Sequence, residues 1–169
     1  MESNSLKSAN EQRRQDRRVH QVEFDRRCFD RRDKAFVYEK QVYLSDTNAV
    51  GNTYFAKYFE WQGIVRESFF FKCLFPDPAA FAKSGIKLIT AEAHMKYKHE
   101  TVLLDKVVIK LTMGKVRRAS AELLFTFRDK NTNKLIGEGS QVVVFADNTG
   151  KPIPMPDVVI KNLKPFINK

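Results

Sequence analysis

The sequence predicts an α+β domain in which one antiparallel sheet wraps around a single long buried helix. Residues 54–73 contain no proline and repeat apolar residues at helical spacing, with further aromatic residues on other sides, which is typical of a buried helix. Five segments rich in β-branched and aromatic residues lie around it, one before and four after, and are typical of strands. A sheet enclosing one helix buries the apolar surface of both.

The strands are expected to be joined by short turns, with one further helix at the C-terminal end. Turn-forming residues lie at Gly114 and at residues 129–134, and residues 156–167 are expected to form the terminal helix. Four consecutive antiparallel strands leave the sheet with open edges. Pairing two copies edge to edge would cover them, so we expect a homodimer or a homotetramer. The five expected strands are residues 36–44, 88–98, 102–113, 117–128 and 135–145.

The long helix should begin near residue 54, where the side chain of Asn52 or Thr53 is suited to cap its N-terminus. Gly63 lies in its middle, where glycine costs about 1 kcal/mol relative to alanine. We therefore expect another backbone to pack closely against the helix at this position.

Residues 1–35 differ from the rest in composition and are interpreted as an arm, with the domain covering residues 36–169. The arm carries ten Lys or Arg and seven Asp or Glu, has few aliphatic residues, and contains F-D-R-R twice. The five-residue period of that repeat does not keep one helix face. Such a segment buries too little surface to fold alone, so we expect a solvated, partly disordered arm. The alternative is an arm that orders on a partner.

Composition excludes several classes of protein. The two cysteines, Cys28 and Cys73, form no disulfide or metal-ligand pattern, which favours a reduced, cytoplasmic protein. The sequence has no apolar run long enough to span a membrane and no signal peptide, and no cofactor or metal is expected. The net charge of +10 favours an anionic partner. Nucleic-acid binding rests on charge alone and is not favoured.

Residues 45–71 carry a family resemblance. They resemble the loop and helix of hotdog-fold thioesterases of the 4-hydroxybenzoyl-CoA thioesterase superfamily, and most closely the enediyne polyketide thioesterases. Those enzymes have T-N-x-V-G-N, a tyrosine, and a helix with W-Q-G-x-x-R-E. The matching residues here are Thr47, Asn48, Val50, Gly51, Asn52, Tyr54, Trp61, Gln62, Gly63, Arg66 and Glu67. The resemblance extends over about residues 36–156 and implies a hotdog fold with a five-stranded sheet around the helix. Lys57 departs from it, because the family usually has Asn there.

The loop lacks the carboxylate that many hotdog thioesterases use. Their loop reads D-x-D-x-x-G, and the second Asp is the nucleophile or general base. Asn48 occupies that position here, and an amide neither accepts a proton near neutral pH nor forms an anhydride. Asp46, at the first Asp position, is expected to point elsewhere.

The resemblance to enediyne thioesterases implies catalysis by Asn48 and Arg66 without a carboxylate. The thioester carbonyl would be polarised by backbone N–H groups of Gly51, Asn52 and Tyr54 at the helix start. Arg66, as a fixed cation, would stabilise the oxyanion or hold water or hydroxide near the carbonyl. Asn48 would orient the carbonyl or the attacking water.

Plainer roles exist for these side chains. Asn48 is also suited to be a turn residue, and Arg66 to pair with Glu67 or Asp46. The role of Glu67 stays open between pairing with Arg66 and activating water.

Two arginines after the Gly114 turn, Arg117 and Arg118, resemble a pair that binds coenzyme A phosphates in the superfamily, and the alternative is plain solvated charge. The expected function is therefore hydrolysis of a fatty or polyketide acyl thioester. The acyl group would be carried by coenzyme A or by an acyl carrier protein. The alternative is a non-catalytic sensor or scaffold that binds an acyl thioester.

Overall fold

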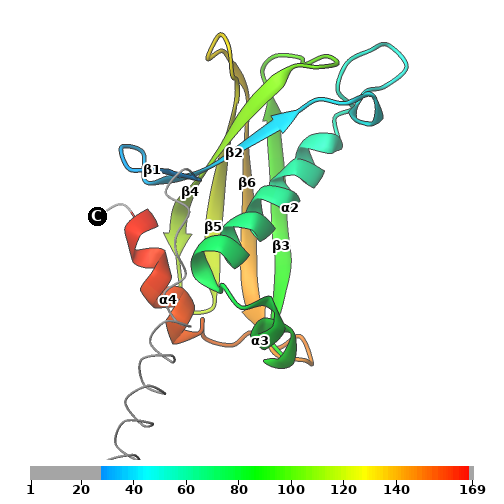
Figure 1. Ribbon diagram of the computed structural model, residues 1–169. Helices are drawn as coiled ribbons and strands as arrows, with labels where there is room; N and C mark the ends of the chain where they lie inside the picture. Colours follow the sequence, from blue (N-terminus) through cyan, green and yellow to red (C-terminus); the bar gives the residue numbers. More distant parts are fainter. Residues whose placement is uncertain (1–27, 168–169) are drawn as a thin grey trace, which may run out of the picture.

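The computed structural model describes residues 28–167 and contains the predicted sheet and helix (Figure 1). Six strands form one sheet in the order β1-β2-β4-β5-β6-β3, with antiparallel neighbours. The predicted fold class is confirmed, and the strand that the sequence did not predict is the two-residue β1. The strands are β1 (Phe29–Asp30), β2 (Ala35–Gln41), β3 (Lys87–Tyr97), β4 (Lys106–Val116), β5 (Ser120–Asp129) and β6 (Leu135–Ala146).

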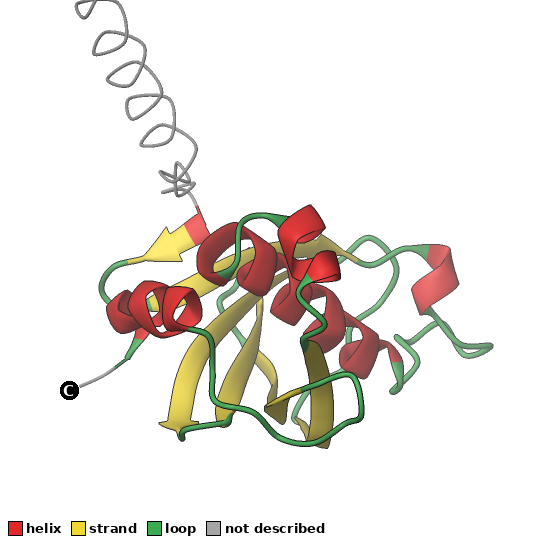
Figure 2. Ribbon diagram, turned by 90° about the horizontal axis from the view of Figure 1, so that it is seen from below, coloured by secondary structure: helices red, strands yellow, loops and turns green. Residues whose placement is uncertain are grey.

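Helix α2 (Lys57–Phe69) lies against one face of the curved sheet, as Figures 1 and 2 show. Its inward side chains include Trp61, Val65 and Phe69, each at most 2% exposed. Burying a large apolar side chain contributes about 1.5–3 kcal/mol, so these residues hold the helix on the sheet. The facing strands supply every second residue, as the alternation of buried and partly buried positions along β4 and β5 shows.

The start of α2 differs from the prediction. The helix begins at Lys57 after Ala56 and has no side-chain cap, so the expected cap from Asn52 or Thr53 is wrong. The Thr53 hydroxyl is engaged elsewhere, 2.6 Å from that of Thr101, and Asn52 lies within the loop, where its backbone N–H donates to Asn48 Oδ1.

The predicted close packing at Gly63 is also absent. Apart from the two adjacent residues and the backbone of α2 itself, no described residue has an atom within 4 Å of the place where a Cβ would stand. Within one protomer, nothing therefore requires glycine at this position.

The C-terminal end of α2 widens into a π-helical segment, η3, and the chain then forms short helices. The predicted terminal helix is confirmed as α4 with the 3₁₀ turn η4 after it. Val159 and Leu163 of α4 are buried in the core. The bounds of these elements are η3 (Phe70–Leu74), α3 (Pro78–Lys83), α4 (Asp157–Leu163) and η4 (Lys164–Phe166).

The beginning of the described chain belongs to the folded unit. The ring of Phe29 in β1 lies 5.0 Å from that of Phe166, and Lys110 forms ion pairs with Asp30 and Asp33. The sheet thus extends into residues assigned above to the arm. Residues 1–27, the rest of the predicted arm, lie outside the described residues.

Truncation tests this boundary. Removing residues 1–27 is expected to leave the melting temperature within about 2 °C of the full-length value. Removing residues 1–35 is expected to lower the stability by about 2–4 kcal/mol, through loss of the partly buried Phe29 ring and of the two carboxylates that pair with Lys110. Equal melting temperatures for the two truncated proteins would show that β1 contributes nothing.

Strand β3 forms one edge of the sheet. Its eleven residues are mostly exposed, including Ile89 and Tyr97 at 38% and 44%, and no described strand pairs with its outer side. The register with β6 shifts between Thr90 and Glu92, which marks a bulge. A bulge bends the strand and redirects a side chain.

Candidate functional site

The loop before α2 is closed by hydrogen bonds to Asn48. Its side-chain Oδ1 accepts from the backbone N–H groups of Val50 and Asn52 at 3.1 and 3.2 Å. Gly51 in between has φ of 89°, in the left-handed region that favours glycine. Asn48 is therefore a turn residue, but of its two side-chain polar atoms only the oxygen serves the turn. The side-chain Nδ2 of Asn48 donates to no described residue, whereas its backbone N–H donates to the carbonyl oxygen of Asn52 at 2.8 Å.

The backbone N–H groups expected to form the oxyanion hole are occupied. Those of Gly51 and Asn52 donate to Asn48, and that of Tyr54 donates to the carbonyl oxygen of Asp46 at 2.8 Å. In this conformation they cannot also bind a substrate. The next two backbone N–H groups, those of Phe55 and Ala56, have no acceptor among residues 28–167 and lie at the start of α2.

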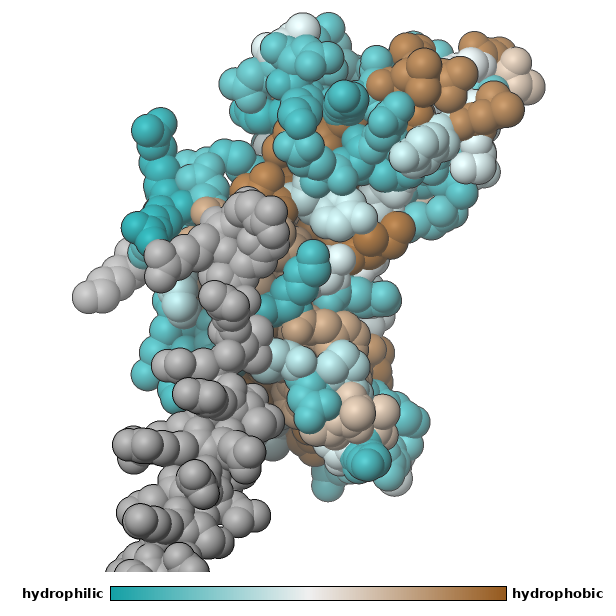
Figure 3. Space-filling view, viewed as in Figure 1, coloured by the Kyte–Doolittle hydropathy of each residue, from teal (hydrophilic) through white to brown (hydrophobic). Residues whose placement is uncertain are grey.

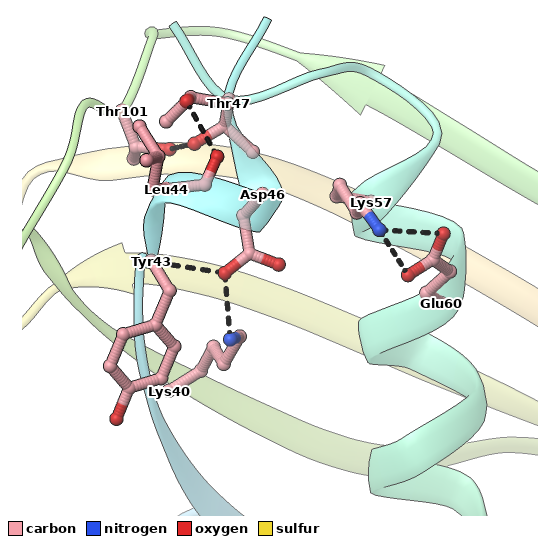
Figure 4. Close-up of polar contacts among 9 residues, drawn as sticks. Lys40, Tyr43, Leu44, Asp46, Thr47, Lys57, Glu60 and Thr101 are labelled. Atoms are coloured by element: carbon pink, nitrogen blue, oxygen red, sulfur yellow. Dashed lines mark hydrogen bonds and ion pairs between the residues drawn. The ribbon is translucent and has the colours of Figure 1, made fainter. Parts of the chain in front are cut away.

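The side chain of Asp46 bonds to Lys40 and to the backbone of Tyr43 just before this loop, as Figure 4 shows. It is 6% exposed, and its Oδ2 accepts from Lys40 Nζ at 2.8 Å and from the Tyr43 N–H at 2.9 Å. Burial alone would raise the pKa of Asp46, but these hydrogen bonds outweigh it and the pKa lies below its ordinary value. A paired carboxylate with a lowered pKa is a poor general base, which supports the expectation that Asp46 does not replace the missing acid.

Replacing Asp46 with asparagine is expected to destabilise the protein by about 2 kcal/mol at neutral pH, because Lys40 loses its ionic partner. The lowered pKa sets the pH dependence. The stabilisation from ionised Asp46 paired with Lys40 is complete above the ordinary pKa range of a carboxylate and is lost as the pH falls through the lowered pKa of Asp46. The difference in free energy of unfolding between wild type and Asp46→Asn should therefore shrink toward pH 3. Urea unfolding at pH 7 and at pH 3 measures it. A constant difference would show that the pair contributes nothing.

A cleft of about 400 Å³ opens beside the Asn48 loop, at the N-terminal end of α2. In its wall, Tyr58 is 3% exposed and its hydroxyl lies 2.9 Å from that of Thr101. Burial raises the pKa of Tyr58, so the phenol stays protonated. The Tyr97 hydroxyl donates to the carbonyl oxygen of Phe55 at 2.9 Å and joins β3 to the helix start. The cleft is lined by Asn48, Asn52, Thr53, Tyr54, Phe55, Tyr58, Tyr97, Lys98, His99 and Glu100.

Apolar side chains are exposed at the same end of the molecule, where Figure 3 shows brown surface. They belong to the loop before α2 and to the loop that precedes β4. Val50 and Leu44 are the most exposed, at 78% and 75%. The others are Tyr43, Tyr54, Phe55, Val102, Leu103 and Leu104.

Arg66 lies farther along α2, away from Asn48. Its Nη1 donates to Thr90 Oγ1 at 2.5 Å and to Gln141 Oε1 at 3.2 Å, and its Nη2 lies 3.5 Å from Glu67 Oε1. The expected pairing with Glu67 is present, whereas Asp46 pairs with Lys40 instead. A guanidinium has more N–H donors than these three contacts use.

Three contacts show that α2 runs antiparallel to β3. In order along the chain, Phe55 just before α2 meets Tyr97, the Gln62 side-chain amide donates to the carbonyl oxygen of His94 at 3.1 Å, and Arg66 meets Thr90. Asn48 and Arg66 therefore lie toward opposite ends of β3. At about 3.3 Å per residue they are separated by roughly 20 Å within one protomer. The structure does not bring the two predicted catalytic residues together in one chain.

An apolar cavity lies behind Arg66, between the second half of α2 and the sheet. It holds only about 20 Å³ of free space, and Arg66 is its one charged wall residue. Helix α4 closes the far side with Val159 and Leu163. Two methionines, Met113 and Met155, complete the wall.

The remaining predicted residues lie outside the Asn48 cleft. Glu67 is 66% exposed at its side chain, beside Arg66. Arg117 and Arg118 form the exposed turn between β4 and β5, at the end of the sheet where β3 begins. Arg117 lines a separate cleft of about 340 Å³ with Lys115 and Glu122.

The sequence did not single out Tyr97, His99, Thr90 or Gln141. They come from strands far from residues 45–71 in sequence and from one loop, and no short motif marks them. Only the pairing of β3 with β6 and the packing of α2 bring these residues to the helix.

Comparison with known proteins agrees with this fold. A family model described as the thioesterase-like superfamily matches residues 42–163, which is most of the chain. The protein belongs to the thioesterase-like superfamily. No curated protein matches it. The resemblance to hotdog thioesterases inferred from residues 45–71 is thereby confirmed.

Solved structures show the same architecture. The dynemicin thioesterase, studied in its binding of a polyene, is 25% identical, with a TM-score of 0.72 over 80% of this chain and 99% of the other. A 1,4-dihydroxy-2-naphthoyl-CoA thioesterase from Synechocystis is 19% identical, with a TM-score of 0.69 over 77% and 96%. A Staphylococcus aureus protein in complex with CoA is 15% identical, with a TM-score of 0.72 over 78% and 83%. The last two show likeness of fold only.

Two further findings concern residues 28–167. None of the helices in this range is long and apolar enough to cross a membrane. The same residues contain no group of three or more His, Cys, Asp or Glu side chains arranged to hold a metal ion.

Proposed function

We propose that this thioesterase-like protein hydrolyses fatty or polyketide acyl thioesters of coenzyme A or of an acyl carrier protein, without a catalytic carboxylate. The observation that carries the proposal is the Asn48 amide at the cleft beside α2. It stands at the position of the usual carboxylate, and its nitrogen is open to a substrate. The chain's superfamily and its 25% identity to the dynemicin thioesterase support hydrolysis as the chemistry.

The active site in this proposal is shared between two copies. The open edge of β3 suits pairing with β3 of a second copy about a two-fold axis, which makes the two strands antiparallel. The end of β3 next to Arg66 in one copy then lies beside the end next to Asn48 in the other. We infer this arrangement because Asn48 and Arg66 of one chain are too far apart to act on the same thioester.

The thioester carbonyl oxygen would lie between fixed hydrogen-bond donors. We assign these to the Asn48 amide and to the backbone N–H groups of Phe55 and Ala56, with the helix dipole of α2 adding positive potential. Arg66 of the second copy would stabilise the oxyanion as a fixed cation. Thr90 and Gln141 would hold its guanidinium in place.

The apolar cavity behind Arg66 would receive the acyl chain. Its walls are apolar apart from Arg66, and Met113 and Met155 are side chains that change shape readily to admit a chain. This suits fatty and polyketide chains better than polar acyl groups. Glu67 is assigned a supporting role, through its contact with Arg66.

Recognition of the carrier is assigned to the basic surface. Arg117 and Arg118 are exposed and suited to bind the phosphates of coenzyme A or of a phosphopantetheine arm. The net charge of +10 also suits an acidic carrier protein.

A panel of acyl-CoA and acyl-carrier-protein thioesters tests the proposed function, with release of the free thiol as the readout. Turnover of medium to long acyl chains is expected. Tight binding of a non-hydrolysable acyl-CoA analogue without turnover of any thioester would identify the alternative, an acyl-thioester sensor or scaffold, which the missing carboxylate also allows. Light scattering at micromolar concentration is expected to give a dimer or a tetramer, and a monomer would contradict the shared site.

A further inference from the structure

The ring of His99 is oriented by a backbone carbonyl. His99 follows β3 and lines the same cleft as Asn48, and its Nδ1 lies 2.7 Å from the carbonyl oxygen of Leu135. A carbonyl oxygen only accepts hydrogen bonds, so Nδ1 carries the proton and donates it. In a neutral imidazole Nε2 then holds the lone pair. The cleft therefore has a proton acceptor whose tautomer is fixed by β6.

The other titratable groups of the cleft are less suited to accept a proton from water. Burial raises the pKa of Tyr58 and of Tyr97, which keeps both phenols protonated. Glu100 has no hydrogen bond or ion pair within the described part of the chain, so nothing there orients its carboxylate. Besides His99, the titratable side chains facing this space are Tyr54, Tyr58, Tyr97, Lys98 and Glu100, with Lys134 next to Leu135.

We propose that His99 is the general base that replaces the missing carboxylate, an inference that rests on the proposed thioesterase function. Nε2 takes one proton from a water molecule while the water oxygen bonds to the thioester carbonyl carbon. The carbonyl π electrons move to its oxygen, beside the Asn48 amide. The oxyanion then re-forms the carbonyl and breaks the carbon–sulfur bond. The thiolate that leaves receives the proton from Nε2–H, which gives a carboxylic acid and a thiol.

The pH dependence of hydrolysis is the test, with His99→Asn as the variant. The asparagine amide can still donate to Leu135, so the loop is kept and only the base is lost. Wild type should lose kcat/KM toward acidic pH, because a protonated imidazole has no lone pair at Nε2 to accept the proton from water. His99→Asn should be slower by about 10²-fold at pH 7.5. Its pH profile should also lack the acid limb, the fall of kcat/KM toward low pH. Added imidazole should restore part of the rate to His99→Ala.

His20→Asn is the matched control, because His20 lies outside residues 42–163, over which the chain matches the thioesterase-like superfamily. It should keep the wild-type rate and limb. Wild-type behaviour of His99→Asn, or loss of the limb in Glu100→Gln instead, would overturn the assignment while leaving the thioesterase function intact. A uniform loss of rate in His99→Asn with the limb kept, and no rescue by imidazole, would also overturn it. Absence of turnover in wild type would overturn both proposals.

Discussion

Replacing Arg66 with methionine is expected to lower kcat/KM for thioester hydrolysis by about 10²–10³-fold, the usual effect of removing one oxyanion stabiliser. Methionine fills a similar volume beside the apolar cavity but carries no charge. Thr90 and Gln141 would then lose the donor that they now accept from. The loss should fall mainly on kcat, because the interaction is strongest in the transition state.

Lys72→Met is the matched control for Arg66→Met, since Lys72 is an exposed cation shortly after α2. It removes the same charge and should leave kcat/KM within about twofold of wild type. Arg66→Lys should retain only part of the activity, because lysine lacks the planar fork. Melting temperatures check that each variant is folded. Full activity in a folded Arg66→Met protein would remove Arg66 from the mechanism.

Asn48 is expected to show a similarly large effect, and two substitutions separate its two roles. Asn48→Ala removes both the oxygen that closes the loop and the amide donor, so both loop order and rate should suffer. Asn48→Asp keeps an oxygen for the N–H groups of Val50 and Asn52 and removes only the donor. Both variants are expected to lose about 10²-fold in kcat.

The comparison of the two Asn48 variants is decisive for the role of the amide. Asn48→Asp should melt close to wild type yet be nearly as slow as Asn48→Ala. Steady-state kinetics and thermal unfolding measure both quantities. An Asn48→Asp protein faster than wild type would mean that the site works better with a carboxylate, and that the donor role assigned to the amide is incorrect.

The fold followed from the sequence because its strongest signals are local. The helical spacing of Trp61, Val65 and Phe69 and the alternation along the later strands both record which face is buried. β1 escaped prediction because two residues carry no periodicity. The start of α2 was placed three residues early because Thr53 and Asn52, good capping residues by type, belong to the loop before the helix, where the Thr53 hydroxyl contacts that of Thr101.

Only part of the candidate site could be proposed from the sequence, for a physical reason. The loop with Asn48 and the helix with Arg66 are continuous in sequence, so a motif can mark them. The motif carries no information on the direction of α2 along β3, which separates the two residues within a chain. His99, Thr90 and Gln141 reach the site only through strand pairing, which is not visible in residues 45–71.

The most direct test of a site shared between two copies is activity after mixing two inactive variants. Asn48→Ala and Arg66→Met proteins are combined in equal amounts under conditions that exchange subunits. If Asn48 of one copy acts with Arg66 of the other, each mixed dimer has one intact site, so activity should recover to about one quarter of the wild-type value. If both residues act within the same chain, every site in the mixture keeps one defect. Activity that stays at the level of the separate variants after confirmed subunit exchange would contradict the shared site.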